Sequence, residues 1–474
     1  MHTAKRIAKN TTVLFVSQLA VSVLFFLSTL YTARYLGTVG FGILSTGLAL
    51  VMILGLLSDL GLNTLTTREI ARDNSLVNKY AGNMIVIKII LAILTFGSIL
   101  IVSILFYSYE LLVVTLFLAV SVILDSFSST FYSIFQAYEK MEYQAIGKSL
   151  ASFLLFLGVI FAINYGLNVV AFASIYFFVS LAVLIYTLII CVWRFVIPKL
   201  EIDLIFWKIT IIEALPLSLA LIFGVIYFRI DMLFLSILKG SYAVGIYSAS
   251  YRLMDFLTFL PIIFTSSILP VLSRFHTSSQ DSLKVSYKLS FKYLLILGLP
   301  IAVGTTILAN DLILLFYDAN FTQSILPLQI IIWTIPLLFL TYLLSTFITS
   351  INKQHILYKI MFLSMITNII LNLILIPKFS YLGSSFVTLI SELMVFMFSF
   401  HYVSKFVCNI DIKKIILKPL IACVIMGIIL LYVHLNLFVM VIIASTTYLF
   451  LLFILKTFSQ EEIDLFKEII GSRT

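Results

Sequence analysis

Several long segments of this sequence contain no charged side chain. Among them are Thr11–Ala33, Ile89–Tyr109 and Leu435–Leu455. About 20 apolar residues in a helix are enough to cross the hydrocarbon core of a bilayer. Because these segments lack the alternation of apolar and polar residues that membrane β-barrel strands show, they predict helices. The sequence therefore predicts an all-α polytopic membrane protein.

The composition agrees with a membrane protein and excludes other classes. Apolar residues make up 62% of the chain and charged residues 11%, whereas soluble domains have about 45–50% and about 25%. The three cysteines, Cys191, Cys408 and Cys423, show neither metal-ligand spacing nor a disulfide framework. The five histidines are scattered and give no zinc pattern. We expect no metal and no cofactor.

About fourteen apolar segments are predicted to span the membrane, with short connections between them. The connection Asn164–Asn168 carries turn residues that divide one long apolar stretch into two spans. The approximate bounds of the spans are 11–33, 41–62, 86–107, 111–135, 149–164, 168–192, 213–237, 242–270, 291–309, 324–350, 359–376, 381–401, 417–434 and 436–456.

Lys and Arg residues gather on one side of the predicted membrane. If the N-terminus is cytoplasmic, all but five of the 30 basic residues fall in cytoplasmic connections or tails; the exceptions are Arg34, Arg229, Lys239, Arg252 and Lys378. Such a bias over short loops sets the orientation of a membrane protein. We therefore expect a multi-pass protein of the cytoplasmic membrane with both termini inside. Its net charge of +9 suits anionic lipids rather than nucleic acid.

A short internal repeat predicts two similar halves. Gly42–Ser45 (Gly-Ile-Leu-Ser) recurs as Gly245–Ser248 (Gly-Ile-Tyr-Ser) at an offset of 203 residues, which covers six predicted spans. An even number of spans keeps the orientation, so the two lobes are expected to be parallel six-helix bundles with a cavity between them. The expected parts are an N-terminal lobe at 1–197, a cytoplasmic linker at 198–208, a C-terminal lobe at 209–404, two additional spans at 405–456 and a cytoplasmic amphipathic tail at 457–474.

The tail begins with a helix-capping pattern. Ser459 and Glu462 have the spacing of a capping box, and Ile463, Phe466 and Ile470 then share one helix face. This pattern predicts a short helix that lies on the inner leaflet.

Several groups of residues, spread over nearly the whole chain, resemble one transporter family in their order and spacing. The groups are Ala33–Gly42, Ser58–Asn63, Thr67–Arg72, Arg229–Asp231, Val244–Arg252, Leu269–Ser273 and Tyr381–Ser385, the last of which follows Pro377. With them the chain resembles the polysaccharide transporter family, the Wzx-type lipid-linked oligosaccharide flippases. That family belongs to the multidrug/oligosaccharidyl-lipid/polysaccharide exporter superfamily.

The resemblance implies a flippase rather than an enzyme. It implies export of an isoprenoid-diphosphate-linked oligosaccharide by alternating access, for the synthesis of cell-surface polysaccharide or glycan. It also implies two six-helix lobes with two additional C-terminal spans. The implied partners are the lipid-linked oligosaccharide and membrane lipids, with other glycan-assembly membrane proteins and a coupling H⁺ or Na⁺ as further candidates.

Arginines inside predicted spans are candidates for binding the diphosphate. Arg34, Arg229 and Arg252 lie in the outer parts of the first, seventh and eighth spans. Forked guanidinium donors suit phosphate oxygens, and a charge within the membrane needs a reason. The alternative is that Arg34 reaches to the membrane surface and that Arg252 pairs with Asp255 one helical turn away.

Arg68 is a fourth candidate, because it lies with Arg72 at the predicted cytoplasmic mouth where substrate would arrive. The alternative for both arginines is the ordinary excess of positive charge on the cytoplasmic side. Asp59 is expected to pair with one of them.

Four carboxylates within predicted spans are candidates for ion coupling. Asp125 and Glu392 have no basic residue within one helical turn, so they are the better candidates for a group that changes partner or protonation during transport. Asp231 and Asp255 are expected rather to neutralise nearby arginines. The alternative for all four is a paired structural carboxylate.

Two competing functions are considered. A cation-coupled multidrug exporter of the same superfamily would favour an acidic, aromatic cavity, whereas this sequence places arginines there. A membrane glycan polymerase or glycosyltransferase would carry a sizeable outside loop or a carboxylate-centred site, and neither is evident. The triplet Gly147–Ser149 (Gly-Lys-Ser) looks like the end of a phosphate-binding loop, but no strand precedes it and it opens a membrane helix, so we reject it.

Overall fold

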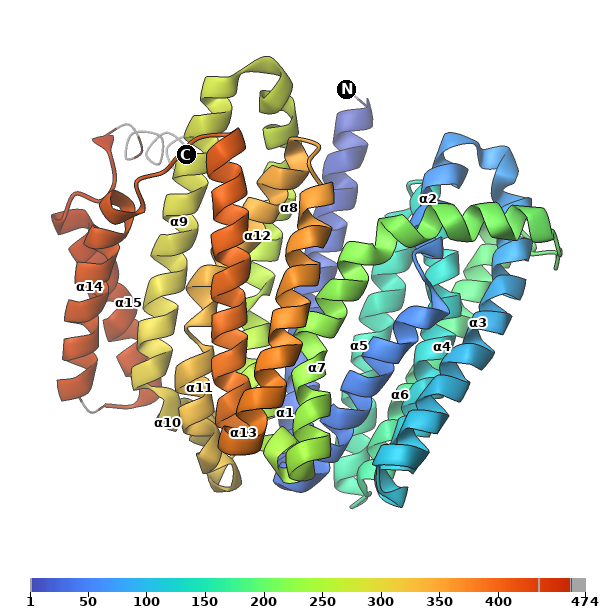
Figure 1. Cartoon of the computed structure of the whole chain (residues 1–474), viewed down its shortest axis with the longest axis horizontal. Coiled ribbons are helices and arrows are strands. Elements are labelled where there is room, and N and C mark those ends of the chain that lie inside the picture. The colour runs from blue at the N-terminus through green and yellow to red at the C-terminus, as the bar shows by residue number, and fades with distance from the viewer. Residues whose placement is uncertain (1, 434, 461, 463–474) are drawn as a thin grey trace. The chain divides into compact units, whose positions relative to one another are not determined.

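The computed structural model describes residues 2–433, 435–460 and 462, and within these ranges every regular element is a helix. Figure 1 shows them as a set of long helices. The expected all-α fold is thereby confirmed for the described residues. The α-helices are α1 (His2–Leu54), α2 (Leu62–Arg72), α3 (Val77–Phe106), α4 (Tyr109–Ala137), α5 (Met141–Asn164), α6 (Val169–Arg194), α7 (Leu204–Leu257), α8 (Phe259–Ser278), α9 (Gln280–Ile307), α10 (Ala309–Phe316), α11 (Ile325–Ile331), α12 (Thr334–Ser350), α13 (His355–Phe406), α14 (Ile412–Tyr432) and α15 (Leu437–Ile454). Three short 3₁₀ helices are η1 (Gly55–Ser58), η2 (Asn74–Leu76) and η3 (Ala319–Ser324).

Ten helices in the described part of the chain are long and apolar enough to cross a membrane. An eleventh candidate is the pair Ala319–Ile331 and Thr334–Ser350, which is bent by 48° at its break. The chain is therefore a multi-pass membrane protein.

Three of the long helices are interrupted by one residue with non-helical backbone angles. The residues are Gly37 in α1 (φ 64°, ψ −174°), Gly240 in α7 (φ 81°, ψ 175°) and Ser380 in α13 (φ 51°, ψ −133°). Positive φ is a conformation that glycine adopts without the steric penalty of a Cβ atom. Figure 1 shows the chain turning back at the breaks in α1 and α7. Each of these two elements therefore consists of two helices.

Contact density divides the chain into two compact units. Unit 1 comprises residues 1–252 and 361–387, and unit 2 comprises residues 253–360 and 388–474. Unit 1 contains α1 to α6, most of α7 and a part of α13. One buried cluster in it joins Leu65 of α2, Met84 of α3, Phe135 of α4, Cys191 of α6 and Ala214 of α7. The lobe boundaries that the sequence suggests remain a prediction.

The two copies of the internal repeat touch one another inside unit 1. A Cβ atom on Gly42 would lie 1.8 Å from the carbonyl oxygen of Ser241, and one on Gly245 would lie 1.9 Å from the carbonyl oxygen of Thr38. Thr38 and Ser241 are related by the same offset of 203 residues as the two glycines, and so are the breaks at Gly37 and Gly240. Such a reciprocal contact is what two repeats related by an internal two-fold axis would make. The contact supports the repeat inferred from sequence.

The end of the predicted linker and the first turn of α7 are fixed to α3 by polar contacts. Trp207 Nε1 and the backbone N–H of Asp203 both donate to Asn83 Oδ1, at 2.8 and 3.0 Å. Lys79 pairs with Asp203 at 3.0 Å. The hydrogen bond from the backbone N–H of Phe206, followed by the contact with Lys79, lowers the pKa of the Asp203 carboxyl. The predicted linker is therefore anchored on unit 1 rather than free.

The capping box at the start of the tail is confirmed. The backbone N–H of Ser459 donates to Glu462 Oε2 at 2.6 Å, and the backbone N–H of Glu462 donates to Ser459 Oγ at 3.3 Å. Lys292 of α9 also donates to Glu462 at 2.7 Å, which fixes this turn to unit 2. The remainder of the expected tail helix, including Ile463, Phe466 and Ile470, lies outside the described residues.

Candidate functional site

A cluster of charged and aromatic side chains lies on the two sides of the break in α7. The guanidinium carbon of Arg229 lies 5.4 Å from the ring centroid of Tyr251. The hydroxyl of Tyr247 donates to Asp231, whose side chain is only 2% exposed. The rings of Tyr247 and Tyr251 are 5.7 Å apart. The reversal at Gly240 brings these residues together, because it folds the second half of α7 beside the first.

Arg252 lies next in the chain after Tyr251 and has a different aromatic neighbour. Its guanidinium carbon is 5.6 Å from the ring centroid of Phe25 in α1, and the residue is 9% exposed. Tyr176 of α6 is within electrostatic range of it. An arginine over an aromatic face gains a cation–π attraction that grows as water is removed. Two of the three predicted intramembrane arginines, Arg229 and Arg252, are therefore held against rings.

Arg34 is placed differently from these two. It lies three residues before the break at Gly37 and is exposed. The ring of the adjacent residue, Tyr35, stacks on Phe172 of α6 at 5.5 Å. The end of the first half of α1 is thus fixed to α6, and Arg34 projects from that fixed end.

Arg68 is joined to carboxylates from two elements. Its Nε lies 2.6 Å from Glu69 in α2, and one of its terminal nitrogens lies 2.8 Å from Glu213 in the first part of α7. Arg72 also pairs with Glu69, at 3.1 Å. The expectation that Asp59 pairs with Arg68 or Arg72 is wrong, because both arginines have other acidic partners.

Asp59 pairs instead with Lys88 of α3, at 3.1 Å. Lys88 is 1% exposed and donates also to Asn63 Oδ1 at 3.0 Å and to the carbonyl oxygen and hydroxyl of Ser126 in α4 at 2.7 and 3.0 Å. The charge distribution places Lys88 among the basic residues of a cytoplasmic connection, whereas the structure buries it within α3. A lysine near the end of an apolar segment is expected to be solvated, but here the surrounding oxygens allow its charge to be buried.

The sequence does contain a signal that could have located this network. Asp59 and Asn63 belong to the Ser58–Asn63 group and are four residues apart. Two oxygen-bearing side chains at that spacing before a span with a single lysine would have suggested a common cation.

Asp125 has the environment of an accessible group within a span. It lies in the middle of α4 and is exposed, and Ser180 of α6 hydrogen-bonds to it. Asp231, by contrast, is buried and engaged by Tyr247, and it also interacts electrostatically with Arg229. The four carboxylate candidates are therefore not equivalent.

The remaining two carboxylates, Asp255 and Glu392, belong to unit 2. Both lie within electrostatic range of Tyr342 in α12, and Glu392 is buried. One tyrosine is thus within electrostatic range of both acids, although the sequence separates them by more than a hundred residues. Within the described residues, no group of three or more His, Cys, Asp or Glu side chains is arranged to hold a metal ion.

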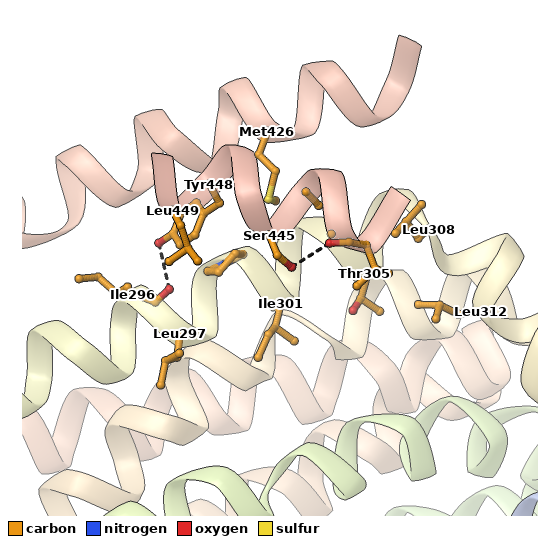
Figure 2. A pocket seen from close by; sticks show the side chains of 14 residues that line it. Ile296, Leu297, Ile301, Thr305, Leu308, Leu312, Met426, Ser445, Tyr448 and Leu449 are labelled. Atoms are coloured by element: carbon orange, nitrogen blue, oxygen red, sulfur yellow. Dashed lines mark hydrogen bonds between the residues drawn. The ribbon is translucent and has the colours of Figure 1, made fainter. Parts of the chain in front are cut away.

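Unit 2 also contains an apolar pocket of about 380 Å³ between α9, α14 and α15 (Figure 2). Its lining includes Ile301, Leu308 and Met426, and Tyr448 crosses it to donate to the carbonyl oxygen of Ile296 at 2.9 Å. A lining of this kind excludes charged ligands and suits a hydrocarbon chain.

The chain matches two family models and one curated relative. The model described as "Polysaccharide biosynthesis protein" matches residues 7–276, more than half of the chain, and the MatE model matches residues 216–374. Capsular polysaccharide biosynthesis protein CapF of Staphylococcus aureus is 24% identical over 204 residues, which are 42% of this chain and 50% of CapF. The chain thus spans about half the length of this curated relative.

Solved structures show the same fold. Lipid II flippase MurJ in an inward closed conformation matches with a TM-score of 0.75 at 16% identity, over 92% of this chain and 97% of MurJ. An inward-facing multidrug resistance MATE family transporter of the MOP superfamily matches with a TM-score of 0.67 at 15% identity, over 83% of this chain and 98% of that one.

The fold is that of an all-helical, multi-pass membrane protein of the MOP type. Within that superfamily the chain belongs to the Wzx-like polysaccharide biosynthesis protein family. This is a family of transporters and not of enzymes, and the resemblance seen in the sequence is confirmed.

Proposed function

We propose that this protein is a flippase that moves an isoprenoid-diphosphate-linked oligosaccharide across the cytoplasmic membrane by alternating access. Membership of the polysaccharide biosynthesis protein family supports a role in cell-surface glycan synthesis. The substrate would be supplied and consumed by other glycan-assembly membrane proteins.

The observation that carries the proposal is the placement of Arg229 and Arg252 against aromatic rings inside apolar helices. A charge at the centre of a membrane costs about 2.5–3.5 kcal/mol on insertion scales, so it requires a function or a partner. A guanidinium group carries paired N–H donors that two phosphate oxygens can accept together, which suits a diphosphate. Arg34 and Arg68 are proposed as further contacts, Arg68 at the point of loading.

The architecture that we propose has 14 spans. Each of the three interrupted helices, α1, α7 and α13, counts as two spans, and the bent pair that ends in α12 counts as one. The proposed arrangement is two parallel six-helix lobes followed by α14 and α15, with both termini in the cytoplasm. The apolar pocket beside α15 would accommodate part of the isoprenoid tail.

We propose ion coupling through Asp125 and Glu392. Asp125 combines an exposed side chain with a position in the middle of a span, and Glu392 is buried within electrostatic range of Tyr342. The neutral variants Asp125→Asn and Glu392→Gln should transport at a rate that no longer depends on an imposed H⁺ or Na⁺ gradient. If both variants keep the gradient dependence of the parent protein, these carboxylates do not couple transport.

A second candidate function is export of cationic drugs, which the match of the MatE model to residues 216–374 favours. The two functions differ in the charge that the site must attract. Arginines at rings favour an anion, so the parent protein should move the lipid-linked glycan and not a cationic dye. Dye transport that survives Arg229→Ala and Arg252→Ala would support the drug exporter.

The direct test is transport of a fluorescent isoprenoid-diphosphate oligosaccharide in proteoliposomes. Arg229→Ala and Arg252→Ala should each lower the initial rate about tenfold or more, because each removes a charge-assisted hydrogen bond to phosphate. The variants Arg229→Lys and Arg252→Lys should transport at rates between those of the parent protein and the alanine variants, because an ammonium keeps the charge but cannot make the forked contact.

Arg274→Ala is the matched control. Arg274 lies at the end of α8, is exposed and also has a neighbouring ring, that of Phe275 at 5.6 Å. Its replacement should leave transport unchanged. Full activity in both Arg229→Ala and Arg252→Ala would overturn the proposed binding of the diphosphate by these arginines.

A further inference from the structure

Lys148 occupies an unexpected position on α5. It lies about 10 Å along the helix from Met141, at the rise of an α-helix, and α5 is one of the candidate spans. The residues one turn before it, one turn after it and two turns after it are Gln144, Ser152 and Leu155, and all three are buried. Lys148 therefore lies on the face of α5 that packs inside unit 1.

The opposite face of α5 is the one that looks outward. Ile146, Phe153 and Leu157 share that face and are all exposed and apolar, as lipid-facing residues are. Lys148 points away from them, so it does not reach the surrounding lipid. Yet Lys148 is exposed, unlike its neighbours along the inner face. An exposed side chain on an inward helix face borders a space that protein atoms do not fill.

The neighbouring helix α4 shows the same anomaly. Asp125 shares a helix face with Leu118, Ser121 and Ser128, which are all buried, and it is itself exposed. α4 and α5 both belong to unit 1. Two helices of one unit thus each present a single charged, accessible residue on an otherwise buried face.

A third observation concerns the residue before Lys148. Gly147 packs against Tyr132 of α4 so closely that a Cβ atom would lie 2.1 Å from the tyrosine hydroxyl. That hydroxyl is buried and has no hydrogen-bond partner within the described part of the chain. An unsatisfied buried hydroxyl is uncommon and marks a place where an acceptor is missing.

Lys148 differs from Lys88, which also lies within a candidate span of unit 1. The ammonium of Lys88 is surrounded by oxygens of Asp59, Asn63 and Ser126. Lys148, in the ranges that the structure describes, has no ion pair. One lysine is therefore fully engaged in holding the fold, and the other has its donors available.

We propose that Lys148 binds a phosphate oxygen of the substrate's diphosphate, in a water-accessible space on the inner side of α4 and α5. The inference rests on the proposed function, to which it adds a residue that the arginine candidates do not include. The ammonium supplies the positive charge and the Tyr132 hydroxyl an additional donor. Lysine acts on phosphate as a mobile point charge, which suits a ligand that must also leave.

The first experiment tests whether the space exists. Lys148→Cys is made in a Cys408→Ser background, because Cys191 and Cys423 are buried, and is treated with a sulfonate-bearing, membrane-impermeant thiol reagent from both sides. We expect it to react. Ser152→Cys on the same face and Ile146→Cys on the lipid face are the controls and should stay unmodified. A Lys148→Cys variant that does not react overturns the proposal.

The second experiment tests anion binding without transport. Binding of inorganic diphosphate to the purified full-length protein is measured by calorimetry. Lys148→Gln should weaken it about tenfold or more, and Lys148→Arg should stay within about threefold of the parent. Lys140→Gln is the control, because Lys140 precedes α5 and faces Glu142 at 4.0 Å. Equal affinity of the parent protein and Lys148→Gln overturns the proposal.

The outcomes separate this inference from the proposed function. Diphosphate binding that needs Lys148, in a protein that does not move lipid-linked glycan, would keep the anion site and reject the flippase. Glycan transport with diphosphate affinity unchanged in Lys148→Gln would keep the flippase and reject Lys148 as a contact.

Discussion

Asp59 is the anionic partner of Lys88, at 3.1 Å, and this pair ties the turn after η1 to the interior of α3. Asp59 is 31% exposed and Lys88 only 1%. The lysine therefore depends on this carboxylate more than the carboxylate depends on the lysine. The asymmetry determines what each substitution should do.

Asp59→Ala should destabilise the protein by about 3 kcal/mol, the lower part of the range for breaking a buried ion pair, because it leaves the Lys88 charge without its anion. The double variant Asp59→Ala/Lys88→Met should recover part of this loss, since no buried charge remains. Thermal unfolding in detergent measures both. Asp281→Ala, which removes an exposed i,i+3 pair with Lys284, is the control and should change stability by less than about 1 kcal/mol. Equal stability of Asp59→Ala and the control would show that Lys88 does not need its partner.

Gly42→Ala should strongly destabilise the folded protein. The added methyl group would meet the carbonyl oxygen of Ser241 at 1.8 Å, which is backbone and cannot rotate away. Overpacking of this kind costs about 1–3 kcal/mol or more. The matched control is Gly97→Ala in α3, where nothing lies within 4 Å of the new Cβ atom. Alanine there should be neutral or slightly stabilising. The fraction of monodisperse protein after extraction, together with the melting temperature, decides between these outcomes.

Arg68→Ala should lower transport without lowering stability. The side chains of Arg68 and Glu213 are 36% and 51% exposed. Loss of this ion pair should therefore change the stability by less than about 1 kcal/mol. If the guanidinium also receives the arriving diphosphate, the transport rate of Arg68→Ala should fall several-fold while the melting temperature stays constant. Glu213→Gln removes the same ion pair but keeps the arginine, and it should transport normally. A similar fall in Glu213→Gln would instead assign the effect to the ion pair.

The start of the tail should detach from α9 in acid. Burial raises the pKa of Glu462, but hydrogen bonds from Lys292, Ser459 and Tyr293 outweigh it and lower the pKa below its ordinary value of about 4.3. A carboxyl with a lowered pKa in the docked state stabilises docking above the ordinary pKa, and this contribution is lost as the pH falls through the lowered value. Fluorescence from a probe after Thr474 should therefore change only below about pH 4. Glu462→Gln should remove the transition, and a transition retained in that variant would assign it to another group.

Much of the fold could be predicted because hydropathy and local patterns act over short distances. The charge-free segments do form helices, and the capping box at Ser459 and Glu462 depends on only four residues. The repeat was visible in the Gly42 and Gly245 tetrads. The physical basis of the repeat is an approach of two backbones that excludes a Cβ atom. This approach could not be seen in the sequence, because it depends on contacts between distant segments.

The candidate site was predicted less completely. Arg229 and Arg252 stand out in sequence because a charge within an apolar segment is conspicuous. Lys88 and Lys148 lie near the ends of apolar segments, so hydropathy assigned both to cytoplasmic connections. What distinguishes them is tertiary: the oxygens of Asp59 and Ser126 around one, and the inward helix face of the other. The spacing of apolar residues along one helix predicts which of its faces points inward. Only the neighbouring helices determine whether the space beside that face is filled by side chains.

The contact between Gly42 and Gly245 also limits how the second halves of α1 and α7 can move. Where two helices meet through side chains, they can slide by exchanging rotamers, but here the main chains abut and no such adjustment is possible. The two segments can still rotate about the point where they cross, but they cannot slide along one another. Any rearrangement of these two segments during a transport cycle should therefore use this point as a fulcrum.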